Sequence, residues 1–359
     1  MNISIRSVLA YSVIASGTLG CHGGANLRGD RGATGATGAN GVPGADGLPG
    51  ADAEGGCTCI VATGGDIQAC VDDVCAKGGG SVCLEAGDFE TSGVEIACSN
   101  IDLRGQGWST VVRLADAAYS TVIFLGDKSG ASTVTGLRVS NLAVDGNKSG
   151  NPNSETDANG QTINAIGIGW AEDVEIEDVL VEDARSGGIV TLGAVSGLKL
   201  EGVTVRGSTF DGLAFNDTSD IMVSGCLLEQ NLYAGISADW GLSGIISGNV
   251  LTGNGAGEDG TGGNPGIYLA GLDGLLLANN FIENSSGNAV MLTDSQTGAG
   301  CATNVILDGN MLVGSGAYGV WVAQPACSGV GIHTCYQHNL LGDLLDGFGV
   351  FTEIEPVCE

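Results

Sequence analysis

The chain has 359 residues, of which 64 are glycine, and its formal net charge is −29. Hydrophobic residues make up 43% of the chain, which excludes a disordered polar protein, and the combination of abundant glycine with only 15% charged residues excludes a long helical bundle. Nucleic-acid binding is excluded as well, because phosphates require a basic surface and no Lys or Arg follows Arg206.

The N-terminal residues 1–20 are expected to form a signal peptide. Arg6 is the only charge before an apolar stretch that is too short to cross a bilayer. The sequence Thr18-Leu19-Gly20-Cys21 resembles the cleavage box of bacterial lipoproteins, although that family usually places Leu one position earlier. The resemblance implies that Cys21 is lipidated, so that the protein is an outer-membrane or cell-surface lipoprotein with a tether at 21–28. Ordinary cleavage nearby would instead leave a secreted protein.

A collagen-like stalk is predicted at residues 29–52. Glycine occupies every third position there, in eight uninterrupted Gly-X-Y triplets. Only glycine fits the crowded axis of three wound polyproline-II chains, so this period is specific. The segment predicts a homotrimer and, if wound, a stalk of about 70 Å. A linker follows at residues 53–63.

Residues 64–359 are predicted to form an all-β solenoid. A strand with apolar first and third residues recurs with a period near 23, for example at 174–179, 198–203 and 221–226. A second apolar pair follows each copy. A third strand opens each coil, at Ile166, Ile189, Leu213, Ile236, Ile267, Val290, Val320 and Val350. Three short strands per repeat, with Gly and Asn at the corners, indicate a right-handed parallel β-helix of about 8–10 coils.

The entry to the solenoid resembles a known family. Residues 66–71 read as a short amphipathic helix, and 78–89 follow it as Gly-Gly-Gly-Ser-Val-Cys-Leu-Glu-Ala-Gly-Asp-Phe. This pattern is similar to the capping motif of the pectate-lyase-like superfamily, except that Glu85 stands where the family usually has Pro. The resemblance implies the β-helix fold and a connection with carbohydrates. It implies no particular reaction, because a fold hosts many functions.

The cysteines indicate an exported protein with disulfides at both ends of the solenoid. Cys57 and Cys59 are too close to favour pairing with each other, and Cys226 aligns with buried apolar positions as a core thiol. The candidate disulfide cysteines are Cys57, Cys59, Cys70, Cys75, Cys83, Cys98, Cys301, Cys327, Cys335 and Cys358.

The opening strands carry an aromatic stripe. Alternation places Tyr268, Met291, Trp321 and Phe351 on the outward side of successive coils. An exposed stripe of this kind requires a partner. Two alternatives remain open: a groove in which sugar rings stack on the aromatic side chains, or packing against a neighbouring subunit of the trimer. In the groove interpretation, Trp240 and Asp294 at the following corner join Tyr268, Trp321 and Phe351 as carbohydrate-binding residues.

Two carboxylates in adjacent coils, Asp217 and Asp239, are the candidate catalytic pair of a glycoside hydrolase, because they lie within the separation that such enzymes use. The bases that β-helix lyases use, Arg or Lys, are absent after Arg206. No cofactor is expected, although Ca²⁺ suits oxygen-rich loops such as those holding Asp145, Asp157 and Glu258.

A further column is interpreted as structural. Asn249, Asn280, Asn310 and Asn339 occupy one turn position in successive coils, where stacked amides can hydrogen-bond along the axis. The sequence as a whole predicts a surface-displayed protein that binds polysaccharide or another cell-surface partner. The alternatives are a polysaccharide-degrading hydrolase or lyase and a structural spacer.

Overall fold

The computed structural model describes residues 56–152, 156, 162–257, 263–295, 298, 300–354 and 358. The predicted signal peptide, Cys21, the tether and the Gly-X-Y stalk lie outside the described residues, as do Asp157 and Glu258. None of the described helices is long and apolar enough to cross a membrane.

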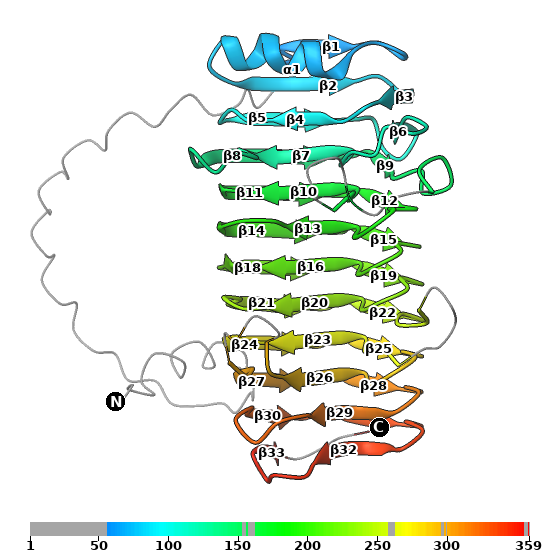
Figure 1. The fold of residues 1–359 in the computed structure, drawn as a ribbon, viewed down its shortest axis with the longest axis vertical. Coiled ribbons are helices and arrows are strands. Elements are labelled where there is room, and N and C mark those ends of the chain that lie inside the picture. The colour runs from blue at the N-terminus through cyan, green and yellow to red at the C-terminus, as the bar shows by residue number, and fades with distance from the viewer. Residues whose placement is uncertain are drawn as a thin grey trace, which may run out of the picture. The chain divides into compact units, whose positions relative to one another are not determined.

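The described chain forms a parallel β-helix, as the repeat predicts. Three sheets run along it, and each strand pairs in parallel with the equivalent strand of the next coil (Figure 1). Sheet A contains β1 (Cys59–Val61), β2 (Gly80–Leu84), β5 (Ile101–Arg104), β8 (Val134–Ser140), β11 (Ala171–Glu177), β14 (Val195–Glu201), β17 (Thr218–Ser219), β18 (Ile221–Ser224), β21 (Gly244–Ser247), β24 (Asp273–Ala278), β27 (Thr303–Asp308), β30 (Gly329–Ile332) and β33 (Phe351–Ile354). Sheet B contains β3 (Gly87–Thr91), β6 (Thr110–Leu114), β9 (Ala143–Asp145), β12 (Leu180–Glu182), β15 (Thr204–Arg206), β19 (Leu227–Glu229), β22 (Val250–Thr252), β25 (Phe281–Glu283), β28 (Met311–Val313) and β31 (Cys335–Gln337). Sheet C contains β4 (Val94–Ile96), β7 (Ile123–Gly126), β10 (Ile166–Gly169), β13 (Ile189–Thr191), β16 (Leu213–Asn216), β20 (Ile236–Asp239), β23 (Ile267–Ala270), β26 (Val290–Thr293), β29 (Tyr318–Val322) and β32 (Gly342–Asp346).

A helix closes the N-terminal end of the solenoid. Helix α1 (Ile67–Ala76) begins after Asp66, whose carboxylate accepts a hydrogen bond from the Ala69 N–H at 3.1 Å. It buries Ile67, Val71 and Val74 against the first strands. This helix covers the edge where coil stacking begins, as the resemblance to the capping motif implies.

Disulfides lie within each of the two ends of the described solenoid, as the cysteine clusters predict. The cap contains Cys57–Cys83, Cys59–Cys70 and Cys75–Cys98, and the C-terminal coils contain Cys301–Cys327 and Cys335–Cys358. Cys226 is a buried free thiol, and its burial raises its pKa to about 11, which keeps it protonated.

The core is apolar, and at the turns beside it buried asparagine side chains hydrogen-bond from one coil to the next. The Oδ1 atom of Asn280 accepts hydrogen bonds from the backbone N–H and the side-chain amide of Asn249, and Asn310 does the same for Asn280. All three side chains are buried. The structural interpretation of this column is therefore confirmed for these three residues.

The fourth asparagine of the predicted column was misplaced. Asn339 accepts from the Ser315 N–H and belongs to a second ladder with Asn231 and Asn254, at the corner between sheets B and C. In the coil that β29 opens, the sheet A strand is β30, so residues 334–339 form the corner after it and β31. The first column ends instead on Thr334, whose hydroxyl donates to the Leu307 carbonyl at 3.1 Å.

Candidate functional site

The outward face of sheet C carries the predicted stripe. Strand pairing places Ser237, Tyr268, Met291, Trp321 and Leu345 in one column of successive coils. Their strand neighbours, such as Ile267, Leu269, Val290 and Val320, are fully buried. The stripe residues are partly exposed, and adjacent members stand about 4.8 Å apart. The predicted positions of Tyr268, Met291 and Trp321 are confirmed.

Phe351 does not belong to this stripe, and its assignment is corrected. It begins β33 in sheet A, where it is 7% exposed and packs its ring beside Gly329 and Gly331. The opening strand of the last coil is β32, in which Leu344 follows Val320 by 24 residues. The spacing of 30 that the preceding coils suggested led to Val350 instead, so Leu345 takes the place assigned to Phe351.

One end of the sheet C strands holds a carboxyl group that the sequence did not single out. Asp211 lies just before β16, and its carboxylate accepts from the Ala234 N–H at 2.8 Å and bonds the hydroxyl of Ser237, the first stripe residue. Asp211 is partly exposed as a residue, but neighbouring protein atoms desolvate its carboxyl group, and this desolvation raises its pKa to about 7. The equivalent positions in adjacent coils are Gly187 and Ala234. A charged residue in a column of small ones was therefore the only sequence feature that could have pointed to Asp211.

An aromatic pair adjoins Asp211. The rings of Phe210 and Tyr233 lie with their centroids 4.8 Å apart, and Tyr233 remains 39% exposed. This pair places a flat apolar surface beside a carboxyl group that can donate or accept a proton near neutral pH. The pair lies at the corner between sheets B and C, just before the sheet C strands of its two coils.

The other end of the sheet C strands carries Asp217, Asp239 and Trp240. Asp239 ends β20, and the exposed Asp217 lies one coil earlier at the corner, where its N–H bonds the Trp240 carbonyl at 3.2 Å. Asp217 and Trp240 therefore lie in one corner column of adjacent coils. A catalytic role for the pair stays a prediction.

A small hollow opens beside Asp217. Its volume is about 170 Å³, and its lining includes Glu172, Ser196, Asp217 and Thr218 but not Asp239. One carboxylate oxygen of Asp239 is buried without a hydrogen-bond partner among the described residues. The two carboxylates thus face different surroundings, and the structure brings Asp217 to Glu172 rather than into a shared hollow with Asp239.

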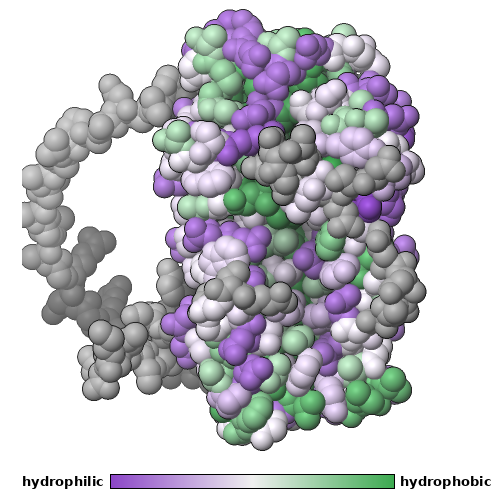
Figure 2. Space-filling model, in the orientation of Figure 1, coloured by the Kyte–Doolittle hydropathy of each residue, from purple (hydrophilic) through white to green (hydrophobic). Residues whose placement is uncertain are grey.

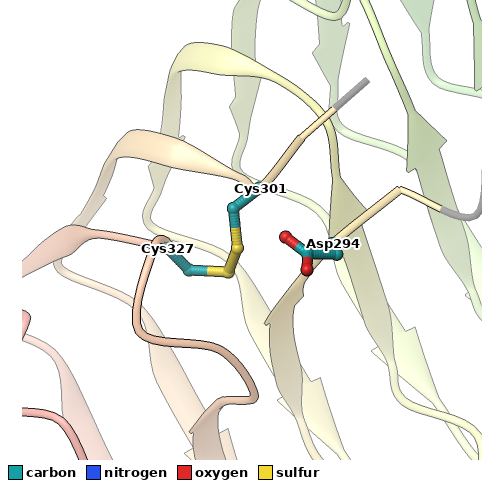
Figure 3. Close-up of side chains that lie close together, drawn as sticks. All are labelled: Asp294, Cys301 and Cys327. Atoms are coloured by element: carbon teal, nitrogen blue, oxygen red, sulfur yellow. A yellow bond between two sulfur atoms is a disulfide. The ribbon is translucent and has the colours of Figure 1, made fainter. Parts of the chain in front are cut away.

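Asp294 lies at the same corner further along the solenoid. It forms an isolated bridge with Cys301 and stands beside the Cys301–Cys327 disulfide (Figure 3). Its side chain is exposed. The two sulfur atoms are bonded to each other and are not thiolates, so these three residues do not make a metal site of the zinc type.

Of the residues named for a calcium site, Asp145 lies among the described residues, whereas Asp157 and Glu258 do not. Asp145 accepts from the Asn147 N–H at 2.7 Å, and the Asn147 amide donates to Leu114 and Asp116. These groups already serve the fold of their own loop. The remaining oxygen-rich loop positions lie outside the described residues, so a Ca²⁺ site stays a prediction.

Comparison with known proteins supports the fold. Residues 162–335 match the family model described as a right-handed β-helix region. The ORF18 protein of Geobacillus virus E2 is similar at 15% identity and a TM-score of 0.62, over 82% of this chain and 59% of that chain. Alginate lyase from Paenibacillus sp. str. FPU-7 is similar at 15% identity and a TM-score of 0.61, over 82% of this chain and 99% of that one.

A third solved structure extends the same picture. Tailspike protein 2 of Escherichia coli O157:H7 bacteriophage CAB120 is similar at 13% identity and a TM-score of 0.58, over 78% of this chain and 38% of that chain. This chain therefore spans less than two thirds of the length of either viral protein. No curated protein matches the sequence. At these identities the likeness shows the right-handed parallel β-helix alone.

Proposed function

We propose that the outward face of sheet C binds a neutral polysaccharide. The observation that carries this proposal is the column of Tyr268, Met291 and Trp321, which places two aromatic side chains two coils apart along the solenoid. Aromatic faces stack on the apolar faces of sugar rings, and carboxylates and amides at both ends of the strands can bond hydroxyl groups. An extended glycan lying along the solenoid axis matches the linear order of these groups.

The charge distribution selects the substrate class. No Lys or Arg follows Arg206, so the coils that hold the stripe offer no cationic side chain to a uronate. A similar fold occurs in an alginate lyase, whose name indicates an anionic polymer. In this chain the acidic surface repels such a polymer, so a neutral glycan is favoured.

The setting of this site is an exported protein. Five disulfides among the described residues suit an oxidising compartment. We propose that residues 1–20 direct export, that Cys21 carries a lipid anchor, and that the Gly-X-Y triplets at 29–52 join three chains. Trimerisation would present three glycan sites together, which raises avidity at a cell surface.

Replacing Trp321 by alanine tests the binding site. We expect affinity for a neutral polysaccharide to fall about tenfold or more, because truncating an aromatic anchor costs roughly 2 kcal/mol. Affinity electrophoresis with starch, a β-glucan and a galactomannan measures this loss. Trp108→Ala is the matched control, since Trp108 is 52% exposed and lies outside sheet C. Equal binding by Trp321→Ala and the native chain, or equal loss in both variants, would refute the site.

A second candidate function, glycoside hydrolysis, is favoured by Asp211. A carboxyl with a pKa near 7 beside an aromatic surface has the protonation state of a general acid at neutral pH. If the protein cleaves its glycan, Asp211→Asn should reduce the release of reducing ends by about 100-fold or more. Asp239→Asn and Asp217→Asn, measured in parallel, test the pair predicted from the sequence. Full activity in Asp211→Asn would exclude it as the acid.

A further inference from the structure

The outward side of sheet A changes character along the solenoid. In its N-terminal coils, one column reads Asp102, Arg138, Glu175 and Lys199, and the Lys199 ammonium lies 2.8 Å from Glu175. These charges pair within the chain. From the next coil onward five successive members of the same column are apolar, namely Met222, Ile245, Leu276, Ile306 and Val330, and the column ends on Thr352. Met222 is 48% exposed and Ile245 is 40% exposed.

A second apolar column lies on sheet B in the same coils. Strand pairing aligns Leu227, Val250, Phe281 and Met311, all of which remain at least partly exposed, with Val250 at 38%. Each is the outward residue that begins its strand, and the buried Leu228, Leu251, Ile282 and Leu312 follow. We call the two columns the sheet A stripe and the sheet B stripe.

The two stripes flank one corner of the solenoid. In each coil the two stripes are separated only by the short turn that holds the ladder of Asn249, Asn280 and Asn310. In one coil, for example, this turn lies between Ile245 and Val250. Neither stripe contains a charged residue, although the whole chain carries −29. Two uncharged apolar columns on adjoining faces expose hydrophobic surface that soluble monomers rarely leave uncovered.

We propose that copies of this chain pack head to tail around that corner, with the sheet A stripe of one copy against the sheet B stripe of the next. An interface between two different patches is heterologous, and it closes into a ring when the rotation matches the number of copies. The triplets at 29–52 supply that number, because a collagen-like stalk joins three parallel chains. This interface rests on the proposed function only for the number of copies, three, and does not depend on glycan binding.

The charge of the chain supports an apolar contact between copies. Copies that lie side by side repel one another, because each carries a formal net charge of −29. Apolar contact suits such neighbours, since the coils after Arg206 offer no cations for ion pairs between acidic copies.

In this arrangement the neighbouring copies do not cover the sheet C stripe. Tyr268 and Trp321 lie on the third face, away from the corner between sheets A and B. The two alternatives for the aromatic stripe are thereby separated: copies meet through sheets A and B, and the aromatic side chains of sheet C remain available to a glycan.

Sedimentation equilibrium of the full chain tests the interface. We expect the native protein to be a trimer and Leu276→Lys, in the sheet A stripe, to weaken association about 100-fold or more. Met291→Lys is the matched control, because Met291 is an outward apolar residue of sheet C, and it should remain trimeric. Both substituted side chains point outward, and circular dichroism checks that each variant is folded.

A charge-pair variant distinguishes the geometry. In the double variant Leu276→Lys/Phe281→Glu, a head-to-tail contact brings Lys of one copy to Glu of the next, so trimerisation should return. A symmetric contact through the sheet A stripe alone would bring Lys to Lys and give no rescue. A native monomer or dimer, a trimer unaffected by Leu276→Lys, dissociation of Met291→Lys, or no rescue would each overturn the proposal. Glycan binding by the Leu276→Lys monomer would show that the two proposals stand separately.

Discussion

Replacing Asn280 by alanine should lower the free energy of unfolding by about 3–5 kcal/mol, because two or three buried polar groups would lose their partners at roughly 1–3 kcal/mol each. The Asn280 amide accepts from the Asn249 N–H at 3.1 Å and from the Asn249 side chain at 2.9 Å, and it donates to the Ile246 carbonyl at 2.9 Å. No water reaches this position to replace them, since Asn280 is 1% exposed.

Urea unfolding followed by circular dichroism measures this loss. Asn284→Gly is the control: Asn284 lies in the same coil but is an exposed corner residue with φ +53°, and Gly253 and Gly314 occupy the equivalent corners of the adjacent coils. It should change stability by only a few tenths of a kcal/mol. A loss below 1 kcal/mol for Asn280→Ala would show that the ladder does not hold the coils together.

The second large effect is expected for Asp211→Asn and depends on pH. The pKa of Asp211 is raised from 3.8 to about 7 by burial, so between these values the folded chain keeps a proton that the unfolded chain releases. Stability contributed by this group is therefore present at low pH and falls as the pH rises from about 4 to 7. A shift of this size corresponds to roughly 4 kcal/mol in total.

Asparagine mimics the protonated carboxyl and can still accept from the Ala234 N–H. The variant should match the native chain at pH 4 and exceed it by up to about 4 kcal/mol at pH 8. Thermal or urea unfolding at both pH values checks the difference, with the exposed Asp220→Asn as control. Equal stability of Asp211→Asn and the native chain at pH 8 would contradict the buried carboxyl.

The repeat made the fold predictable, and departures from it account for the errors. Period-2 alternation assigned Tyr268 and Trp321 correctly, because every coil repeats the same inward and outward sides. Phe351 and Asn339 were misassigned because they lie in the last two coils, where too few following copies fix the register. The spacing of 30 residues, which includes a loop insertion, was extended from Val320 to Val350, but the strand that follows Val320 lies only 24 residues later, at Leu344.

The remaining features depend on contacts between coils. The raised pKa of Asp211 arises from desolvation between stacked coils, which no local sequence pattern reveals, and the hydrogen bonds from Ala234 and Ser237 of the next coil only partly offset it. The sheet A stripe was in principle visible, because Met222 stands between the inward residues Ile221 and Val223. Its importance follows only when the sheet B stripe is found on the other side of the same corner, since one apolar column alone indicates no particular partner.

Hydrophobic surface also gathers at the C-terminal end of the solenoid. Leu340, Leu341 and Phe348 are 75%, 60% and 49% exposed, and Figure 2 shows hydrophobic residues at that end of the molecule. Leu344, the inward residue of β32, remains only partly buried because no further described coil stacks beneath it. The glycan site proposed here lies on the middle and later coils of sheet C and does not depend on this end.

The most direct test of the central claim is a binding isotherm of the native full chain with a neutral polysaccharide and, separately, with alginate of similar length. We expect saturable binding of the neutral polymer that is lost in Trp321→Ala and kept in Trp108→Ala, and no binding of alginate at low or physiological ionic strength. Preferential binding of alginate, or binding of the neutral polymer that survives Trp321→Ala unchanged, would contradict a neutral-glycan site on sheet C.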